Sequence, residues 1–210
     1  MPAEPAEPVS GELPLFPLQA VLFPGGLLGL TVFEARYLDL MTACLRNRTD
    51  FGVVALQGGS DVRRSGETVS FEPIGTRAEL ISADSERPGI LLVRCRGTTR
   101  FRVETSHQQA DGLWLARTTS IDGDEVLAPD ASLLDTVRAL AATIPTLKNN
   151  RNASPFLQPY RFDDAGWVAN RWCEILPISQ AAKQKLMELP DPMVRLELVD
   201  DFLRSRGVIK

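Results

Sequence analysis

The sequence has few of the side chains that usually carry catalysis or hold metal ions. Its 210 residues include one histidine, His107, and three cysteines, Cys44, Cys95 and Cys173, which lie far apart in the chain. No C-x-x-C pair occurs, so neither the ligand spacing of a zinc site nor a disulfide framework is present. We therefore expect no metal and no cofactor, and a reducing cytoplasm is the simplest compartment.

Motifs of common enzyme classes are also missing. There is no G-x-x-x-x-G-K-[ST] phosphate loop and no G-x-S-x-G nucleophile elbow. His107 has polar neighbours, which favours a solvated residue beside a turn over a general base. The acidic cluster Asp122, Asp124 and Glu125 lacks the apolar surroundings that tune a carboxylate for catalysis, which favours a solvated linker. We expect no enzyme, with an unrecognised small-molecule enzyme as an open alternative.

Long apolar runs and a strong excess of charge are absent too. No uninterrupted apolar run approaches the roughly 18 to 20 residues of a membrane helix, so no membrane partner is expected. The net charge of −4 gives no overall electrostatic reason to bind nucleic acid. The opening MPAEPAEPVSGE lacks the basic start and apolar core of a signal peptide. Its proline and acidic content predicts a disordered tail over residues 1–11.

The most individual stretch of the sequence runs from Leu13 to Met41. Proline has no backbone donor, so LPLFPL at its start predicts an edge strand or an extended arm rather than a central strand. Pro24-Gly25-Gly26 predicts a turn, and alternation from Leu28 to Val32 predicts a strand. The apolar period then changes to four residues, which predicts a helix of about three turns beginning near Glu34.

Short apolar runs separated by turns follow, and they predict strands at 51–56, 69–71, 76–82 and 113–119. GILLVRCRGTTRFRVETS predicts a hairpin that turns at Gly97-Thr98-Thr99. On the face of this hairpin opposite the core, alternation places Arg94, Arg96, Arg100 and Arg102. Several short strands with one early helix predict a small, mostly antiparallel barrel.

The pattern changes near residue 125, where helical spacing of apolar residues begins. Capping residues predict helices that begin at Asp130, Asp163, Ser179 and Asp191-Pro192. Successive helices of this kind predict a small bundle. We therefore expect a barrel subdomain over residues 12–125 and a helical subdomain over residues 126–210.

The pattern LPLFPL-x-x-VLFPGG-x-L-x-L-x-x-FE-x-RYL resembles the opening of the Lon N-terminal domain family. Further matches to the family pattern are Gly75-Thr76-x-Ala78, Arg96-Gly97-x-x-Arg100-Phe101, LPIS at 176–179, Lys183-Gln184 and Arg195-Leu196. The resemblance covers roughly Glu12 to Arg204. It implies an α+β fold, in which a PUA-like (pseudouridine-synthase-and-archaeosine-transglycosylase-like), mostly antiparallel β-barrel is followed by a C-terminal helical bundle.

The resemblance also implies a function. The family module is the substrate-binding region at the front of the ATP-dependent protease Lon, and it occurs as a stand-alone protein. We expect a non-enzymatic module in protein quality control that lacks the ATPase and protease modules of full-length Lon. Its expected partners are unfolded or tagged polypeptides and a protease.

Two surfaces are candidates for binding. In the loop FLQPYRF, Phe156, Tyr160 and Phe162 stand in polar surroundings, and they are either a polypeptide contact or a segment folded back onto the bundle. The four-arginine face offers RNA binding as the alternative function, since PUA-like barrels include RNA binders. Nucleic acid is the less favoured partner, because no aromatic side chains interleave with these arginines.

Overall fold

The computed structural model describes residues 11–58, 69–147 and 154–210. The chain divides into two compact units. The barrel unit takes in the chain as far as Leu22 together with Leu28–Ile121, and the helical unit consists of Phe23–Leu27 and Asp122–Lys210. Of the tail predicted for residues 1–11, only Gly11 lies within the described residues.

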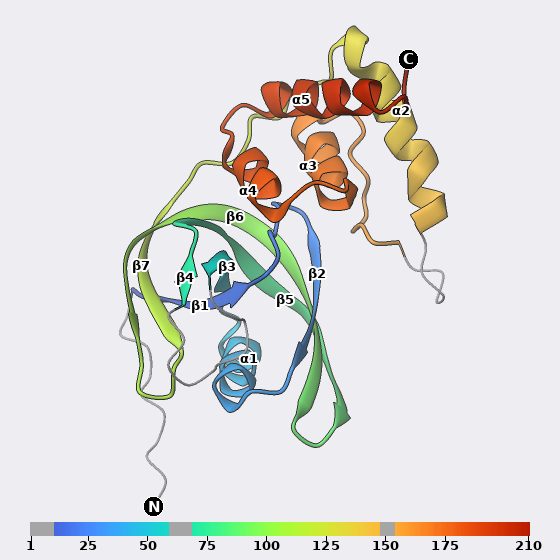
Figure 1. The fold of residues 1–210 in the computed structure, drawn as a ribbon. Helices are drawn as coiled ribbons and strands as arrows, with labels where there is room; N and C mark the ends of the chain where they lie inside the picture. The colour runs from blue at the N-terminus through green and yellow to red at the C-terminus, as the bar shows by residue number, and fades with distance from the viewer. Residues whose placement is uncertain (1–10, 59–68, 148–153) are drawn as a thin grey trace, which may run out of the picture. The chain divides into compact units, whose positions relative to one another are not determined.

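Strand pairing closes the first unit into a barrel (Figure 1). β1 (Leu13–Leu18) pairs in parallel with β3 (Phe51–Gly58) and antiparallel with β7 (Trp114–Ser120). Antiparallel pairing then joins β3 to β5 (Ile74–Arg87), β5 to β6 (Ile90–Gln108), and β6 to β7. The ring β1-β7-β6-β5-β3 is therefore closed, which confirms the predicted, mostly antiparallel barrel.

The first strand differs from its prediction. LPLFPL is neither an edge strand nor an arm, because it has a partner strand on each side. These partners divide it between them, since β7 pairs with Leu13–Leu15 and β3 pairs with Leu15–Leu18. Pro14 lies outside the β3 pairing, and Pro17 lies outside the β7 pairing. A strand that changes partner halfway tolerates prolines that two full ladders would exclude.

The long strand β6 also differs from its prediction. The predicted hairpin turn at Gly97-Thr98-Thr99 is wrong, because residues 90–108 form one continuous strand. Its first part pairs with β5 and its last part with β7, and the partner changes near Phe101. The turn of the real hairpin lies between β5 and β6, where Gly89 adopts a φ of +80°. Glycine inside a strand is compatible with close approach of a neighbour as well as with a turn.

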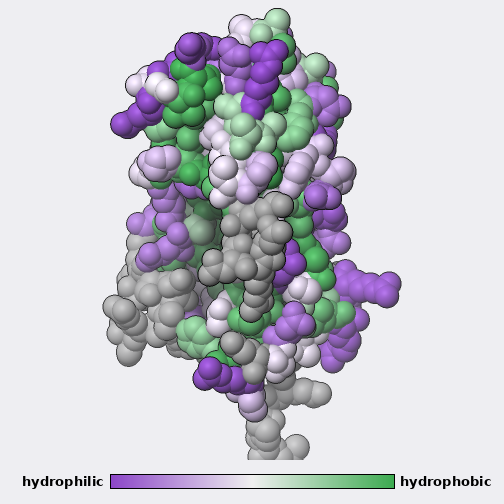
Figure 2. All heavy atoms as spheres, turned by 90° about the vertical axis from the view of Figure 1, so that its right-hand side faces the viewer, coloured by the Kyte–Doolittle hydropathy of each residue, from purple (hydrophilic) through white to green (hydrophobic). Residues whose placement is uncertain are grey.

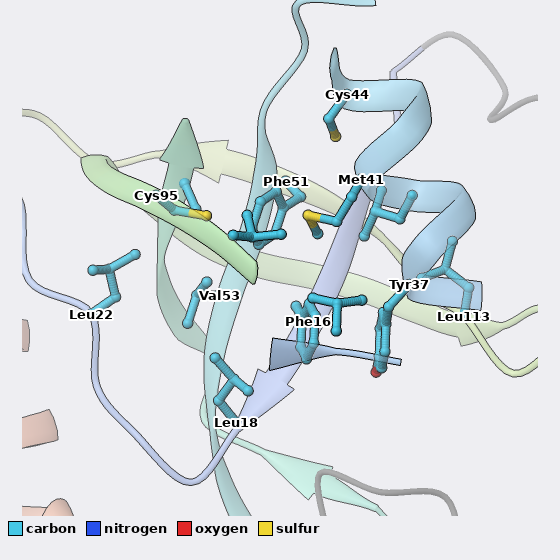
Figure 3. Close-up of a cluster of buried hydrophobic side chains, with 14 of the residues drawn as sticks. Phe16, Leu18, Leu22, Tyr37, Met41, Cys44, Phe51, Val53, Cys95 and Leu113 are labelled. Atoms are coloured by element: carbon cyan, nitrogen blue, oxygen red, sulfur yellow. The ribbon is translucent and has the colours of Figure 1, made fainter. Parts of the chain in front are cut away.

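Apolar side chains cover both faces of the barrel wall. The larger cluster lies against α1 (Ala35–Asn47), and it includes Phe16, Tyr37, Met41 and Phe51 (Figure 3). The rings of Phe16 and Tyr37 stack with their centroids 3.8 Å apart. The smaller cluster consists of Leu13, Leu15, Val54, Phe101 and Ala116. The leucine, valine, methionine and phenylalanine side chains of these clusters each stabilise the fold by about 1.5–3 kcal/mol when fully buried.

Two short strands extend the wall. β2 (Leu27–Val32) pairs with β6, and β4 (Ser70–Phe71) pairs with β3. Leu28 and Leu30 pack against the larger cluster, whereas Gly29 and Thr31 are exposed. In the described part of the chain, β6 is the only strand that pairs with β2. β2 is therefore an edge strand, apolar on the side that faces the barrel.

Helices make up most of the second unit, which confirms the α+β class. They are α2 (Leu134–Thr143), α3 (Ala165–Ile175), α4 (Gln180–Glu188) and α5 (Pro192–Ser205), with short 3-10 turns at Ala131–Leu133 and Ile144–Leu147. Ser179 and Asp191 cap their helices as predicted. Asp164, not Asp163, caps α3 by accepting from the amides of Gly166 and Trp167. None of the helices in the described ranges has the length and apolar character needed to cross a membrane.

Candidate functional site

An arginine of α3 holds the turn Pro24-Gly25-Gly26. Arg171 is fully buried. Its Nη1 donates to the carbonyl oxygen of Gly25 at 2.6 Å, and its Nη2 donates to that of Pro24 at 2.9 Å. Nη2 also donates to Oε1 of Glu174 at 2.6 Å. Charge-assisted bonds of this length are strong, so the backbone of the turn is fixed to the helix.

The two glycines of the turn are required by this close approach. Gly25 has a φ of +73°, and a Cβ there would lie 3.0 Å from Nη1 of Arg171. A Cβ at Gly26 would collide with Oε1 of Glu174. The glycines therefore let a guanidinium and a carboxylate reach the main chain of the turn. The predicted turn is present, but the sequence pattern gave no sign of its partners on α3.

Glu174 titrates in an unusual range for a carboxyl group. Burial raises its pKa from 4.5 to about 7, although the positive charges of Arg171 and Lys183 act in the opposite direction. Its side chain is 18% exposed, and Nζ of Lys183 donates to its main-chain carbonyl oxygen at 2.7 Å. The carboxyl group therefore changes charge near neutral pH, a property shared by functional sites and by structural ion pairs.

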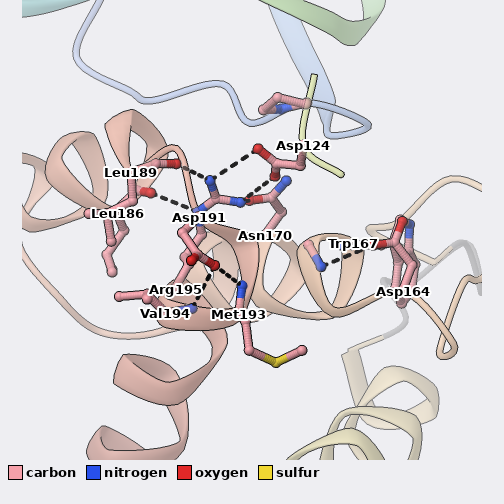
Figure 4. A network of polar contacts seen from close by, with 12 residues as sticks. Asp124, Asp164, Trp167, Asn170, Leu186, Leu189, Asp191, Met193, Val194 and Arg195 are labelled. Carbon is pink, nitrogen blue, oxygen red and sulfur yellow. Dashed lines mark hydrogen bonds and ion pairs between the residues drawn. The ribbon is translucent and has the colours of Figure 1, made fainter. Parts of the chain in front are cut away.

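A second buried arginine, Arg195 of α5, organises the neighbouring network (Figure 4). It donates to the carbonyl oxygens of Leu186 and Leu189, to the carboxylate of Asp124 at 2.6 Å, and to Oδ1 of Asn170 at 3.0 Å. Asp124 is thus the partner of a buried charge. The prediction that Asp124 is a solvated linker residue was wrong. The neighbouring sequence could not indicate the contact, because the arginine lies 71 positions away.

The F-E-x-R-Y segment has a comparable structural role in the barrel unit. Nη2 of Arg36 lies 2.8 Å from the carboxylate of Glu34, and Nη1 donates to the carbonyl oxygen of Gly112 at 2.6 Å. The guanidinium also lies 4.5 Å from the ring centroid of Tyr37. These contacts join the start of α1 to the turn that precedes β7.

The aromatic loop packs back onto α3. Phe156 is buried, whereas Tyr160 and Phe162 are half-buried. Both rings meet the indole of Trp167, with centroid distances of 5.9 Å for Tyr160 and 5.5 Å for Phe162. The sequence left a choice between a binding loop and a loop folded onto the bundle. The structure has the folded arrangement, in which Tyr160 and Phe162 keep part of their surface exposed.

The four-arginine face does not form as predicted. Arg94, Arg96 and Arg102 are exposed, but Arg100 is buried. The alternation shifts just before this point of β6, because the pairing with β5 is irregular there: Ala78 lies opposite Gly97, but Thr76 lies opposite Arg100. The adjacent Phe101 is also buried, in the smaller cluster. Nη2 of Arg96 lies 2.5 Å from the carboxylate of Glu79, and both side chains of this ion pair are exposed. Three exposed arginines remain for an anionic partner.

The remaining reactive groups do not converge. His107 is exposed on β6, and its Nδ1 lies 3.7 Å from the carboxylate of Glu12. Cys44, Cys95 and Cys173 are buried and unbridged, and burial raises the pKa of Cys95 and Cys173 to about 12. Such thiols stay protonated and inert at neutral pH. No cluster of three or more His, Cys, Asp or Glu able to hold a metal ion occurs among the described residues.

Apolar side chains are exposed in both units. On the barrel unit these include Phe33, Leu45 and Ile81, and on α5 they include Val194 and Leu198, one helical turn apart. Figure 2 shows hydrophobic side chains dispersed among hydrophilic ones on one face of the molecule. Scattered apolar residues of this kind are ordinary on a protein surface and do not by themselves define a site.

Comparison with known proteins adds to this geometry. The family profile of the ATP-dependent protease La (LON) substrate-binding domain matches residues 12–205. The fold is similar to the Lon N-terminal domain protein from Xanthomonas campestris, with 31% identity, a TM-score of 0.70, and coverage of 90% of this chain and 96% of that chain. The N-terminal domain of Mycobacterium avium complex Lon protease has 14% identity, a TM-score of 0.59 and the same coverage, which is a likeness of fold alone. No curated protein matches the sequence.

Proposed function

Since the chain belongs to the Lon substrate-binding domain family, we propose that it is a non-enzymatic module that binds polypeptides. The observation that carries the proposal is the family match over residues 12–205. In this proposal the ligands are unfolded or tagged proteins, a protease receives them, and the compartment is the cytoplasm. The engagement of Asp124 with Arg195 and the exposure of His107 support a binding role over a catalytic one.

Strand addition at β2 is the mode of binding that the barrel unit favours. LLGLTV contains neither a charge nor a proline, the two features that most often protect an edge strand from new partners. An extended peptide that pairs with an edge is held through its backbone, largely independently of its side chains. This independence suits a module that accepts many unfolded sequences. Gly29 and Thr31 are exposed, so side chains do not crowd that face of the strand.

In the helical unit, the partly exposed rings of Tyr160 and Phe162 are the proposed contact for apolar side chains of the ligand. The indole of Trp167 packs against both rings and restricts their motion, so little conformational entropy is lost when they bind. Phe156, the first residue of the loop, is buried and is not part of the proposed contact.

The test is a titration of the protein into a fluorescently labelled, permanently unfolded protein, followed by anisotropy. Thr31→Lys adds a charge to β2 and should weaken binding several-fold, because charged side chains block edge pairing. Thr42→Lys adds the same charge to an exposed position of α1 and should leave binding unchanged. Tyr160→Ala with Phe162→Ala tests the aromatic contact.

Two results would overturn the proposal. One is the absence of saturable binding to unfolded proteins. The other is binding of RNA that weakens steeply with salt and disappears when Arg94, Arg96 and Arg102 are neutralised, which would favour the RNA-binding alternative.

A further inference from the structure

We propose that the exposed face of α5 is a docking surface for a basic amphipathic helix of a partner protein. This surface belongs to the helical unit, and it shares no residue with β2 or with the aromatic loop. The inference therefore goes beyond the binding of unfolded polypeptides and does not depend on it.

One side of α5 carries an apolar ridge. Val194 and Leu198 are 41% and 46% exposed, and Phe202, one further turn along, is half-buried. Side chains four residues apart lie on the same face of a helix, so these three form one ridge along more than two turns. The opposite side of α5 carries buried side chains, and the helix packs against α3 (Figure 1). The ridge therefore remains open at the surface.

Two carboxylates flank this ridge on one side. Glu197 follows Val194 by three positions, and Asp201 follows Leu198 by three, so each acid lies beside an apolar member of the ridge. Both acids are exposed. Neither has an ion pair or a side-chain hydrogen bond with any residue that the structure describes. The flank therefore presents two carboxylates that are available to a cation from outside the chain.

This arrangement of acids is unfavourable for α5 alone. Glu197 and Asp201 are four residues apart, and like charges at this spacing destabilise a helix. Arg204, three residues after Asp201, does not bond to it, because its Nε donates to Asp200 at 2.6 Å. A cationic partner would relieve the repulsion between the two acids. Local costs of this kind are expected at functional surfaces.

The ridge and the acidic flank together define the chemistry of the occupant. A ridge of side chains four residues apart packs into the groove of a second helix, which is the commonest form of helix packing. The acidic flank is complementary to lysine or arginine on the facing flank of that helix. The expected occupant is therefore a helix with an apolar stripe and a row of basic residues beside it.

The acidic flank disfavours two other occupants. In a two-fold symmetric, antiparallel pair of α5 helices like flanks meet, so Glu197 and Asp201 would face the same acids of the second copy. The same charges would be repelled by an anionic membrane, and helices that lie on membranes have basic flanks instead. A basic helix satisfies both the ridge and the acids.

The test uses two labelled peptides designed as amphipathic helices of about five turns. One has leucines on one face and lysines beside them, and in the other glutamate replaces every lysine. Fluorescence anisotropy with the full chain should show saturable binding of the lysine peptide that weakens as salt is added. The glutamate peptide should bind little, because its charges repel the acidic flank.

Four variants assign the binding to this surface. Leu198→Ser removes the centre of the ridge and should weaken binding of the lysine peptide by about tenfold. Leu45→Ser is the matched control and should have no effect, since it removes a 50% exposed leucine from a helix of the barrel unit. Glu197→Lys combined with Asp201→Lys should abolish binding of the lysine peptide and create binding of the glutamate peptide. Thr31→Lys on β2 should leave the binding of both peptides unchanged.

The proposal is overturned if neither peptide binds saturably, if both bind equally, or if Leu198→Ser and Leu45→Ser have equal effects. Analytical ultracentrifugation of the protein alone could also overturn it, because a dimer that is lost in Leu198→Ser would assign the surface to a second copy. Binding to vesicles of phosphatidylcholine and phosphatidylglycerol that is lost in the same variant would assign the surface to a membrane.

Discussion

The two units bury different kinds of large side chain. The largest fully buried side chains of the barrel unit are Phe51 and Phe101, whereas those of the helical unit are Arg171 and Arg195. Apolar burial is non-directional and tolerates changes of similar shape. A buried guanidinium depends on every acceptor around it. The barrel is therefore stabilised mainly by non-directional apolar packing. The loops and the turn of the helical unit depend instead on directed hydrogen bonds from buried arginines.

Removal of Arg195 should have the largest effect. Arg195→Met leaves Asp124 and the carbonyl oxygens of Leu186 and Leu189 without their buried donor, which should cost about 3–5 kcal/mol of stability. Urea unfolding followed by circular dichroism measures it. Arg138→Met breaks an exposed pair with Asp135 and should cost less than about 1 kcal/mol. If the two changes lowered stability equally, the special dependence of the helical unit on a buried arginine would be contradicted.

The second largest effect on stability is expected from a change of pH, through Glu174 of the helical unit. The pKa of Glu174 is raised in the folded state, so its protonation stabilises the fold fully below pH 4.5, and that contribution is lost as pH rises through about 7. The shift corresponds to at most about 3 kcal/mol. Urea unfolding at pH 5 and pH 8 should show a larger loss for the wild type than for Glu174→Gln. A loss that is the same in both proteins would assign the pH dependence to other groups.

Two glycine substitutions test the close approach at the turn. Gly26→Ala places a Cβ against Oε1 of Glu174 and 2.9 Å from the carbonyl oxygen of Phe23, which should cost about 2 kcal/mol. Gly29→Ala, three residues later, meets nothing within 4 Å and should be neutral or slightly stabilising. Thermal unfolding of both variants measures the difference. A neutral Gly26→Ala would show that the turn yields easily.

The smallest effect is expected for a change of shape in the barrel core. Phe51→Leu keeps an apolar side chain in the larger cluster, so neighbours can partly fill the space, and it should cost about 1–2 kcal/mol. Arg195→Lys is the matched conservative change in the helical unit. It should cost more, because an ammonium cannot replace the planar fork of donors. If Phe51→Leu lowered the urea midpoint more than Arg195→Lys, the contrast drawn between the two units would be wrong.

Local signals in the sequence predicted most of the elements. The change of period at Glu34, the caps at Ser179 and Asp191, and the strand at 51–56 all depend on neighbours within a few residues. The failures depend on distant partners. The prolines of LPLFPL suggested an edge strand, but the strand has two neighbours: its first residues pair with β7 and its last residues pair with β3.

The same distinction applies to the candidate site. Alternation along β6 could not show that Arg100 is buried, because its partner strands change nearby. Nothing around Asp124 in the sequence indicates Arg195, and nothing around Pro24-Gly25-Gly26 indicates Arg171. The family pattern contains the turn and Arg195, yet a pattern shows which residues occur and not which ones meet. Contacts across 71 or 146 positions are visible only in the folded chain.

The place of Phe23–Leu27 has a consequence for proteolysis. The chain passes from one unit to the other after Leu22, after Leu27 and after Ile121. A single nick after Ile121 therefore cannot release a self-contained barrel, because the turn at Pro24–Gly26 is still held by Arg171 on the other fragment. We expect the two fragments of such a nicked protein to stay together until denaturant is added.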